Sequence, residues 1–174
     1  MEADRPANTW SLSDEGRRRA ERLAEQLKEF QPEVLVSSNE PKATETAEIV
    51  ARLLQLEPRV VEGLHEHDRS NVPYLSAQVF HTSVHEFFQK PAELVFGSET
   101  ADEAYARFYR AVHSVLSTHR GKTIVIVTHG TVLSLFVSRL TGVDATSLWR
   151  ELGLPSFVAM DEGSGTVIVR NNII

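Results

Sequence analysis

Two short runs of the chain, residues 34–36 and 124–127, consist entirely of aliphatic side chains. A strand with one face in water alternates apolar and polar residues, so runs without alternation are typical of strands buried on both faces. Segments with apolar residues at helical spacing precede the first run, at residues 14–30, and separate the two runs, at residues 43–54 and 104–115. Strands and helices that alternate in this way predict an α/β domain, a three-layer sandwich whose mainly parallel sheet is covered by helices on both faces.

The length and charge of the chain limit what it can be. Its 174 residues can bury a core of their own, and they contain no repeat, low-complexity tract or linker, so we expect a single domain over residues 1–174. The net charge of -6 argues against a nucleic-acid-binding protein, because such proteins usually carry a basic face. An acidic protein can still bind an anion where cations converge locally.

Targeting and redox features point to the cytoplasm. No apolar run approaches the roughly 20 residues of a membrane-spanning helix, so we expect no membrane partner. The first ten residues are polar and lack the apolar core of a secretory signal. The chain has no cysteine, which excludes disulfides, cysteine-ligated zinc and a thiol nucleophile. We therefore expect a cytoplasmic location.

Further elements complete the predicted domain. Residues 59–61 form a third short strand, and residues 156–160 and 166–170 flank a polar turn, 161–165, as in a β-hairpin. One or two helices are expected over residues 75–88, and another should follow the strand at 124–127 and end at Gly142. Ser13 and Asp144 are suitable N-caps.

Two loops at the same edge of the predicted sheet are candidate binding loops, because ligands of open α/β sheets bind beyond the carboxyl ends of the strands. One loop begins Ser37-Ser38, and the other contains His129 and Gly130. His129 lies where strand becomes helix, so backbone N–H groups beside it can face an anion; a histidine that only caps or packs the strand end fits the position equally well. Lys42 stands in the first turn of a helix, where the dipole disfavours a cation, so it indicates either a nearby anion or a solvated lysine.

Glu66 lies within a run of titratable residues, 65–69. A carboxylate between two histidines can act as a general acid or base, although a charged surface loop has the same composition. His65 and His67, or His81 and His85, could instead hold a metal. That arrangement lacks a marked third ligand.

Five motifs follow one another in a fixed order along most of the chain. They are Leu12-Ser13-Asp14-Glu15-Gly16, Ser37-Ser38 with Lys42-Ala43 and Thr46-Ala47, Leu64-His65-Glu66, Gly97-Ser98-Glu99-Thr100 with Arg107, and Val127-Thr128-His129-Gly130. Together they resemble the histidine phosphatase superfamily, also called the phosphoglycerate mutase-like family. The resemblance implies the three-layer fold of that family.

It also implies a chemistry in which a nucleophilic histidine takes up a phosphoryl group and passes it to water or to a second hydroxyl. His129 matches the family's second histidine, and Lys42 stands for an arginine that holds phosphate, here as a point charge. Ser37, Ser38 and Gly130 belong to the same phosphate-binding loops. Glu66 corresponds to the acid that protonates the leaving oxygen. No metal or other cofactor is implied, since imidazoles and a cation stabilise the charge.

One family motif has no counterpart in this sequence. The nucleophile belongs to an Arg-His-Gly motif at the end of a first strand, upstream of Leu12, and no histidine precedes His65 here. A start codon assigned too late, a truncation and a true loss all explain this, and we favour a missing N-terminal segment. Its strand would be central to the sheet, so we expect exposed strand edges and little or no catalysis by the chain as it stands.

The leading functional interpretation is therefore a phosphatase of small phosphate esters, favoured over a mutase because the chain is short. Its expected partner is a small phosphorylated substrate or inorganic phosphate. Exposed edges and Phe87-Phe88 are compatible with a homodimer. Two alternatives remain open, a non-catalytic phosphate-binding or interaction module and a metal-dependent hydrolase.

Overall fold

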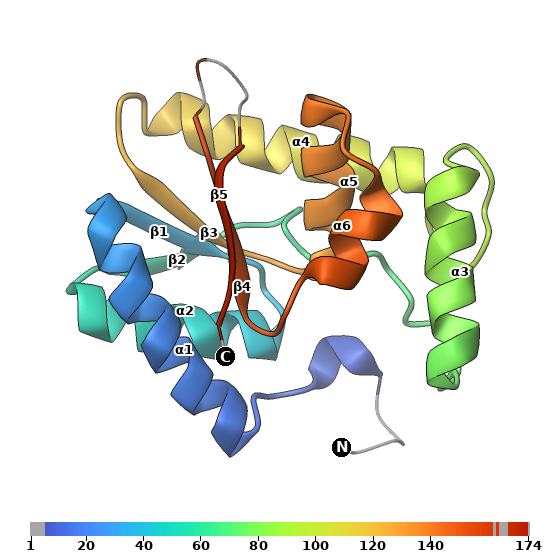
Figure 1. The fold of residues 1–174 in the computed structure, drawn as a ribbon, viewed down its shortest axis with the longest axis horizontal. Helices are drawn as coiled ribbons and strands as arrows, with labels where there is room; N and C mark the ends of the chain where they lie inside the picture. The colour runs from blue at the N-terminus through green and yellow to red at the C-terminus, as the bar shows by residue number, and fades with distance from the viewer. Residues whose placement is uncertain (1–5, 162, 164–166, 174) are drawn as a thin grey trace.

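The computed structural model describes residues 6–161, 163 and 167–173, and its centre is a parallel sheet (Figure 1). The strands are β1 (Val34–Ser37), β2 (Pro58–Val60) and β3 (Ile124–Val127), in the order β2-β1-β3. Leu35 of β1 lies opposite Pro58 on one side and Val125 on the other. The predicted parallel arrangement is confirmed, and it brings the carboxyl ends of β1 and β3 together.

Helices cover both faces of this sheet (Figure 1). Leu35 joins a buried cluster with α1 (Asp14–Leu27) and α2 (Pro41–Leu54), and Val36 joins another with α3 (Ala77–Gln89), α4 (Ala101–Thr118) and α5 (Gly130–Thr141). Successive strand residues point to opposite faces, so β1 contributes to both clusters. The remaining helical elements are η1 (Ala7–Thr9), η2 (Lys28–Phe30) and α6 (Ala145–Glu151).

The helix starts are set by local hydrogen bonds. The side chain of Ser13 accepts a bond of 3.1 Å from Gly16 N, and Asp144 accepts one of 2.8 Å from Ser147 N, so both predicted N-caps are confirmed. Thr100 and Glu103 form a capping box at the start of α4. The expected helix or helices over residues 75–88 form one helix, α3.

The predicted hairpin is present but stands apart from the parallel sheet. Strands β4 (Ser156–Met160) and β5 (Val167–Asn172) pair antiparallel as a separate two-stranded sheet. In the predicted turn, residues 162 and 164–166 lie outside the described part of the chain. Within the described residues, β3 is an edge strand that pairs only with β1, as expected for a sheet without a further central strand.

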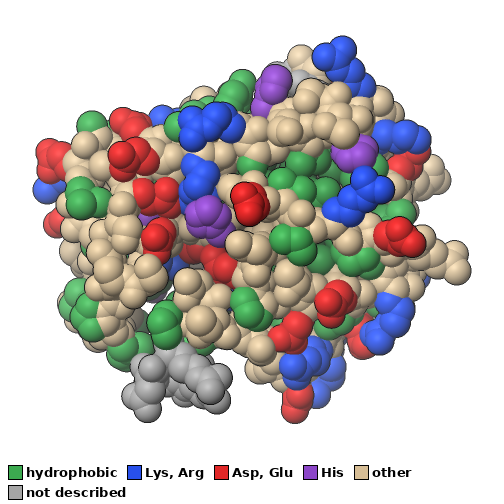
Figure 2. All heavy atoms as spheres, turned by 180° about the vertical axis from the view of Figure 1, so that it is seen from behind, with side chains coloured by type: hydrophobic (Ala, Val, Ile, Leu, Met, Phe, Trp, Pro, Cys, Tyr) green, Lys and Arg blue, Asp and Glu red, His purple; other side chains and the backbone are tan. Residues whose placement is uncertain are grey.

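The surface gives no sign of a basic face on the side drawn in Figure 2, where Lys and Arg side chains are scattered among Asp and Glu. None of the helices in the described residues combines the length and apolar character needed to span a bilayer.

Candidate functional site

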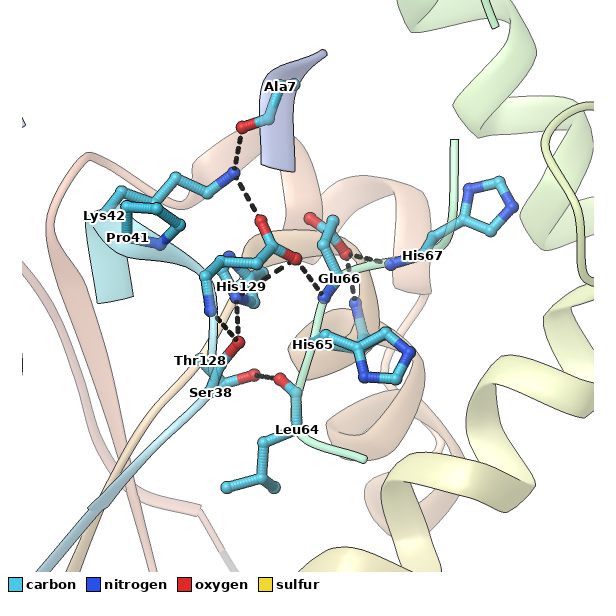
Figure 3. Close-up of polar contacts among 12 residues, drawn as sticks. Ala7, Ser38, Pro41, Lys42, Leu64, His65, Glu66, His67, Thr128 and His129 are labelled. Atoms are coloured by element: carbon cyan, nitrogen blue, oxygen red, sulfur yellow. Dashed lines mark hydrogen bonds and ion pairs between the residues drawn. The ribbon is translucent and has the colours of Figure 1, made fainter. Parts of the chain in front are cut away.

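The two predicted loops meet at the carboxyl edge of the sheet. Because Ser37 lies opposite Val127 in the parallel ladder, the residues that follow them, Ser38 and Thr128-His129, leave the sheet side by side. His129 Nε2 lies 2.8 Å from Ser38 Oγ, and Ser38 N donates to Val127 O at 2.9 Å (Figure 3). Both side chains are buried. Ser38 and His129 therefore form one hydrogen-bonded unit although 91 positions separate them.

A buried carboxylate that sequence reasoning missed lies at the centre of the site. Glu40 is 7% exposed, and its Oε1 accepts a 2.8 Å bond from the backbone N–H of Glu66. The same oxygen is 3.5 Å from His129 Nε2, and Oε2 is 2.8 Å from Lys42 Nζ (Figure 3). Lys42 also donates to Ala7 O at 2.9 Å. An ammonium, a backbone N–H and an imidazole thus converge on one carboxylate.

The position of Glu40 in its helix carried a weak signal of this role. It is the N-cap residue of α2, yet its side chain makes no capping hydrogen bond. Glutamate is not among the residues preferred at that position. A glutamate placed there without capping the helix indicates that its carboxylate is held elsewhere.

Glu66 places a second carboxylate at the start of α5. Its side chain accepts backbone hydrogen bonds from His67, Thr131 and Val132 at 2.9, 3.2 and 3.3 Å. Two of these N–H groups belong to the first turn of α5, where the helix dipole favours an anion. Arg69 lies 3.9 Å from the same carboxylate.

These contacts control the ionisation of Glu66. Burial by itself raises the pKa of Glu66. Four interactions outweigh burial and lower the pKa from 4.5 to about 2: the charge of Arg69, the charge of His129 when it is protonated, and the hydrogen bonds from the N–H groups of His67 and Thr131. Glu66 is therefore a carboxylate near neutral pH. To donate a proton it must first lose part of this stabilisation.

In His129, burial outweighs the nearby charges and sets the direction of the pKa change. Burial lowers the pKa of His129 below 6.5, although the carboxylates of Glu66 and Glu40 oppose the change. The imidazole is therefore neutral near pH 7, and one ring nitrogen can accept a proton while the other donates.

Arg107, on α4, fixes the loop that carries Glu66. Its guanidinium donates to the carbonyl oxygens of Gly63 and His65 at 2.8 and 2.9 Å and to that of Glu66 at 3.2 Å. It also binds both oxygens of Glu99, at 2.6 and 3.2 Å. The Gly97-Thr100 motif and Arg107 thus act together, as a clamp on the loop.

The other predicted residues have less direct positions. The Ser37 hydroxyl is buried and donates to Ser38 O at 3.0 Å, and Ser37 lines neither of the two main cavities. Gly130 begins α5, and a Cβ there would meet Trp149 at 3.7 Å, an ordinary contact. The rings of His65 and His67 point away from Lys42 and His129 (Figure 3).

The histidines do not gather around a metal site. His67 lies against the ring of Phe87, His81 against that of Trp149, and His85 Nδ1 lies 3.1 Å from Thr146 Oγ1. Among the described residues, no group of three or more histidine, aspartate or glutamate side chains could hold a metal ion. The metal-dependent alternative therefore has no geometric support in this part of the chain.

Two cavities meet at the site. One, of about 420 Å³, is lined by Glu40, His65, His67 and neighbouring residues. The other, of about 1710 Å³, extends along β3. Lys42, Glu66 and Arg69 line both, so two cations face the point where the cavities join. Such an arrangement, with the start of α5 beside it, suits a small anion that carries several oxygen atoms.

Comparison with known proteins agrees with this geometry. Residues 6–172 match the family model described as the histidine phosphatase superfamily (branch 1). The chain is 32% identical over 136 residues to phosphoglycerate mutase-like protein 4 of Arabidopsis thaliana, covering 74% of this chain and 59% of the relative. It is 30% identical over 139 residues to the metal-independent phosphoserine phosphatase of the same plant, covering 75% and 58%. The chain thus spans slightly less than three fifths of the length of these curated relatives.

A solved structure shares the fold. The phosphoserine phosphatase of Entamoeba histolytica, in complex with 3-phosphoglyceric acid, superposes with a TM-score of 0.78 at 18% identity. The match covers 97% of this chain and 87% of that one.

Proposed function

The chain belongs to the histidine phosphatase superfamily, and we propose that it binds the phosphoryl group of a small phosphate monoester beside Lys42 and His129. The observation that carries the proposal is the convergence of Lys42, His129 and the Glu66 N–H on the Glu40 carboxylate. A phosphoryl group presents the same kind of oxygen with more charge, so it can take the place of that carboxylate.

Glu66 is the proton donor in this proposal. A dianionic phosphoryl group near Glu66 raises its pKa from about 2, because like charges disfavour the ionised form. The protonated carboxyl group can then give its proton to the ester oxygen as the phosphorus–oxygen bond breaks. As that bond breaks, the phosphoryl group forms a new bond to an imidazole nitrogen. Water then attacks the phosphorus and gives a proton to the Glu66 carboxylate, the phosphorus–nitrogen bond breaks, and inorganic phosphate is released.

Residues 1–174 do not place an imidazole where it could act as this nucleophile. No histidine precedes His65, and the rings of His65 and His67 point away from Lys42. His129 is engaged with Ser38 and Glu40, which suits a group that holds phosphate. We therefore infer that the chain by itself binds phosphate and turns over esters slowly or not at all. Hydrolysis is favoured over mutase transfer because the chain is short.

Binding is tested with inorganic phosphate, by calorimetry or ³¹P NMR titration. Lys42→Met keeps the length of the side chain and removes its charge, so phosphate affinity should fall at least about tenfold. Lys28→Met is the matched control, because Lys28 pairs with exposed Glu25 and lines neither cavity, and it should bind like the parent chain. Equal affinity in the two variants would contradict the proposal.

Turnover is tested by adding free imidazole to an assay with p-nitrophenyl phosphate. If the site lacks only its nucleophile, imidazole should restore hydrolysis in a saturable way that Lys42→Met abolishes. Rapid hydrolysis without imidazole would contradict the inference that the chain lacks its nucleophile. Phosphate binding with no response to imidazole would favour the second candidate, a non-catalytic phosphate-binding module. The rings of His65 and His67, which point away from Lys42, favour this module.

A further inference from the structure

Three aromatic side chains form a cluster beside the proposed phosphate site. Phe80 and His81 lie on α3, and Trp149 lies on α6. The ring centroid of Trp149 is 5.7 Å from that of Phe80 and 5.2 Å from that of His81, and both pairs meet edge to face. All three side chains line the larger cavity. Neither phosphate binding nor proton transfer uses this aromatic cluster, so its role is unassigned.

Two contacts connect the aromatic cluster to the reacting groups. A Cβ at Gly130, which directly follows the phosphate-holding histidine, would lie 3.7 Å from the Cδ1 and Nε1 atoms of Trp149. In addition, the guanidinium carbon of Arg69 lies 4.8 Å from the ring centroid of Phe80, and a nitrogen of the same guanidinium lies 3.9 Å from the carboxylate of Glu66. The cluster therefore begins next to both the phosphate site and the proposed proton donor.

The position of Glu66 sets the direction in which the alcohol part of a substrate extends. In the proposed reaction Glu66 protonates the ester oxygen, so the group bonded to that oxygen lies beside its carboxylate. This carboxylate accepts hydrogen bonds from the first turn of α5, at Thr131 and Val132. Gly130 and Thr131 line the larger cavity but not the smaller one. The alcohol part therefore extends into the larger cavity, where the aromatic cluster lies.

The aromatic cluster is held in place and is still open to a ligand. A contact of 3.1 Å between His85 Nδ1 and Thr146 Oγ1 joins α3 to α6. Phe80 and Trp149 are nevertheless only half-buried, and His81 is exposed. Aromatic rings gain from meeting further rings edge to face or in offset stacks, beyond the gain from burying their area. A ring supplied by a ligand can thus complete a packing arrangement that the chain leaves open.

We propose that the aromatic cluster binds the ring of the leaving group, and that the substrates are small phosphate monoesters of aromatic alcohols or phenols. This inference rests on the proposed function, because it requires the phosphoryl group to lie beside Lys42. A hydroxyl-bearing leaving group would lose water against the ring faces of Phe80 and Trp149, which offer its hydroxyls no acceptor. An aliphatic leaving group would gain burial but no contact between rings. The cluster therefore selects for aromatic esters.

The test compares three phosphonates, whose carbon–phosphorus bond the proposed hydrolysis does not break. Methylphosphonate, cyclohexylmethylphosphonate and benzylphosphonate share one anionic head and differ in the group attached to it. Calorimetric titration of the full chain should show benzylphosphonate binding at least about tenfold tighter than methylphosphonate and about threefold tighter than cyclohexylmethylphosphonate. The reason is that only the benzyl ring gains contacts with other rings.

Two variants of the chain locate the gain. Trp149→Leu and Phe80→Leu each keep an apolar side chain and remove a ring, so the preference for benzylphosphonate over methylphosphonate should fall to about threefold or less. Tyr109→Leu is the matched control, because Tyr109 is 41% exposed on α4 and lines neither cavity, and it should show the preference of the parent chain. Circular dichroism checks that the variants are folded, and the comparison of the three phosphonates on the parent chain needs none of them.

The outcomes separate the two proposals. Failure of both inorganic phosphate and methylphosphonate to bind would overturn the phosphate site and the role of the aromatic cluster together. Binding of methylphosphonate without tighter binding of benzylphosphonate would overturn the role of the cluster alone. Equal affinity for benzylphosphonate and cyclohexylmethylphosphonate, or an unchanged preference in both Trp149→Leu and Phe80→Leu, would overturn it as well.

Discussion

Glu40 should oppose phosphate binding, and replacing it should strengthen that binding. Its carboxylate lies 2.8 Å from Lys42 Nζ and 3.5 Å from His129 Nε2, where a phosphoryl oxygen must lie. Glu40→Gln removes the negative charge and keeps an oxygen that accepts the Glu66 N–H. The hydrogen bond that positions the Glu66 loop is therefore retained.

The size of the effect follows from the charges. Two unit charges about 4 Å apart repel by about 4 kcal/mol at an effective dielectric constant of about 20. Lys42 is 28% exposed, so water screens the site, and the carboxylate can rotate away at some cost. We therefore expect a gain of about 1–2 kcal/mol, which corresponds to roughly tenfold tighter phosphate binding.

Calorimetric titration of inorganic phosphate into the parent chain, Glu40→Gln and Glu48→Gln measures this gain. Glu48 lies exposed on the same helix, so its variant controls for the change in net charge. Affinity in Glu40→Gln that equals or falls below that of Glu48→Gln would refute the reasoning, and would place the bound phosphate away from Lys42.

Two further predictions concern the loop that carries Glu66. Folding lowers the pKa of Glu66 from 4.5 to about 2, so the ionised carboxylate stabilises the fold fully above pH 4.5, and this stabilisation is lost as pH falls towards 2. The free energy of unfolding should fall by roughly 3 kcal/mol over that range. Urea unfolding at several pH values measures this loss, and the Glu66→Gln variant should not show it. The lysine in Arg107→Lys cannot bind both oxygens of Glu99 and three carbonyl groups, so thermal unfolding should show a free energy of unfolding lower by about 2 kcal/mol. Arg110 is exposed on the same helix, and the control variant Arg110→Lys should unfold like the parent chain.

Much of the fold could be predicted because the local signals were strong. Aliphatic runs marked β1 and β3, and Ser13 and Asp144 marked helix starts that the structure confirms. The family resemblance, drawn from five ordered motifs, is confirmed by the match over residues 6–172. The proximity of Ser38 and His129 also followed from sequence, since both come directly after neighbouring parallel strands.

The parts that escaped prediction depend on contacts between distant segments. Glu40 matters only because the loop at Glu66, 26 positions later, folds onto it. The guanidinium of Arg107 donates to the carbonyl oxygen of Gly63, 44 positions earlier in the sequence, and no local sequence pattern predicts that hydrogen bond. The functional roles that the sequence suggests remain proposals, and the binding and turnover experiments test them; the residues concerned are Ser37, Ser38, Lys42, Gly130, Glu66 and His129.

The parallel pairing of β1 with β3 has a kinetic consequence. Helices α1 and α2 pack around β1 using contacts close in sequence, whereas the Ser38–His129 bond must close a loop of 91 residues. Such distant pairings form late, because the entropy of loop closure must be met before they contribute. The proposed phosphate site is incomplete until the Ser38–His129 hydrogen bond has formed. It should therefore lengthen the lifetime of the native state by slowing unfolding, and leave the rate of folding almost unchanged.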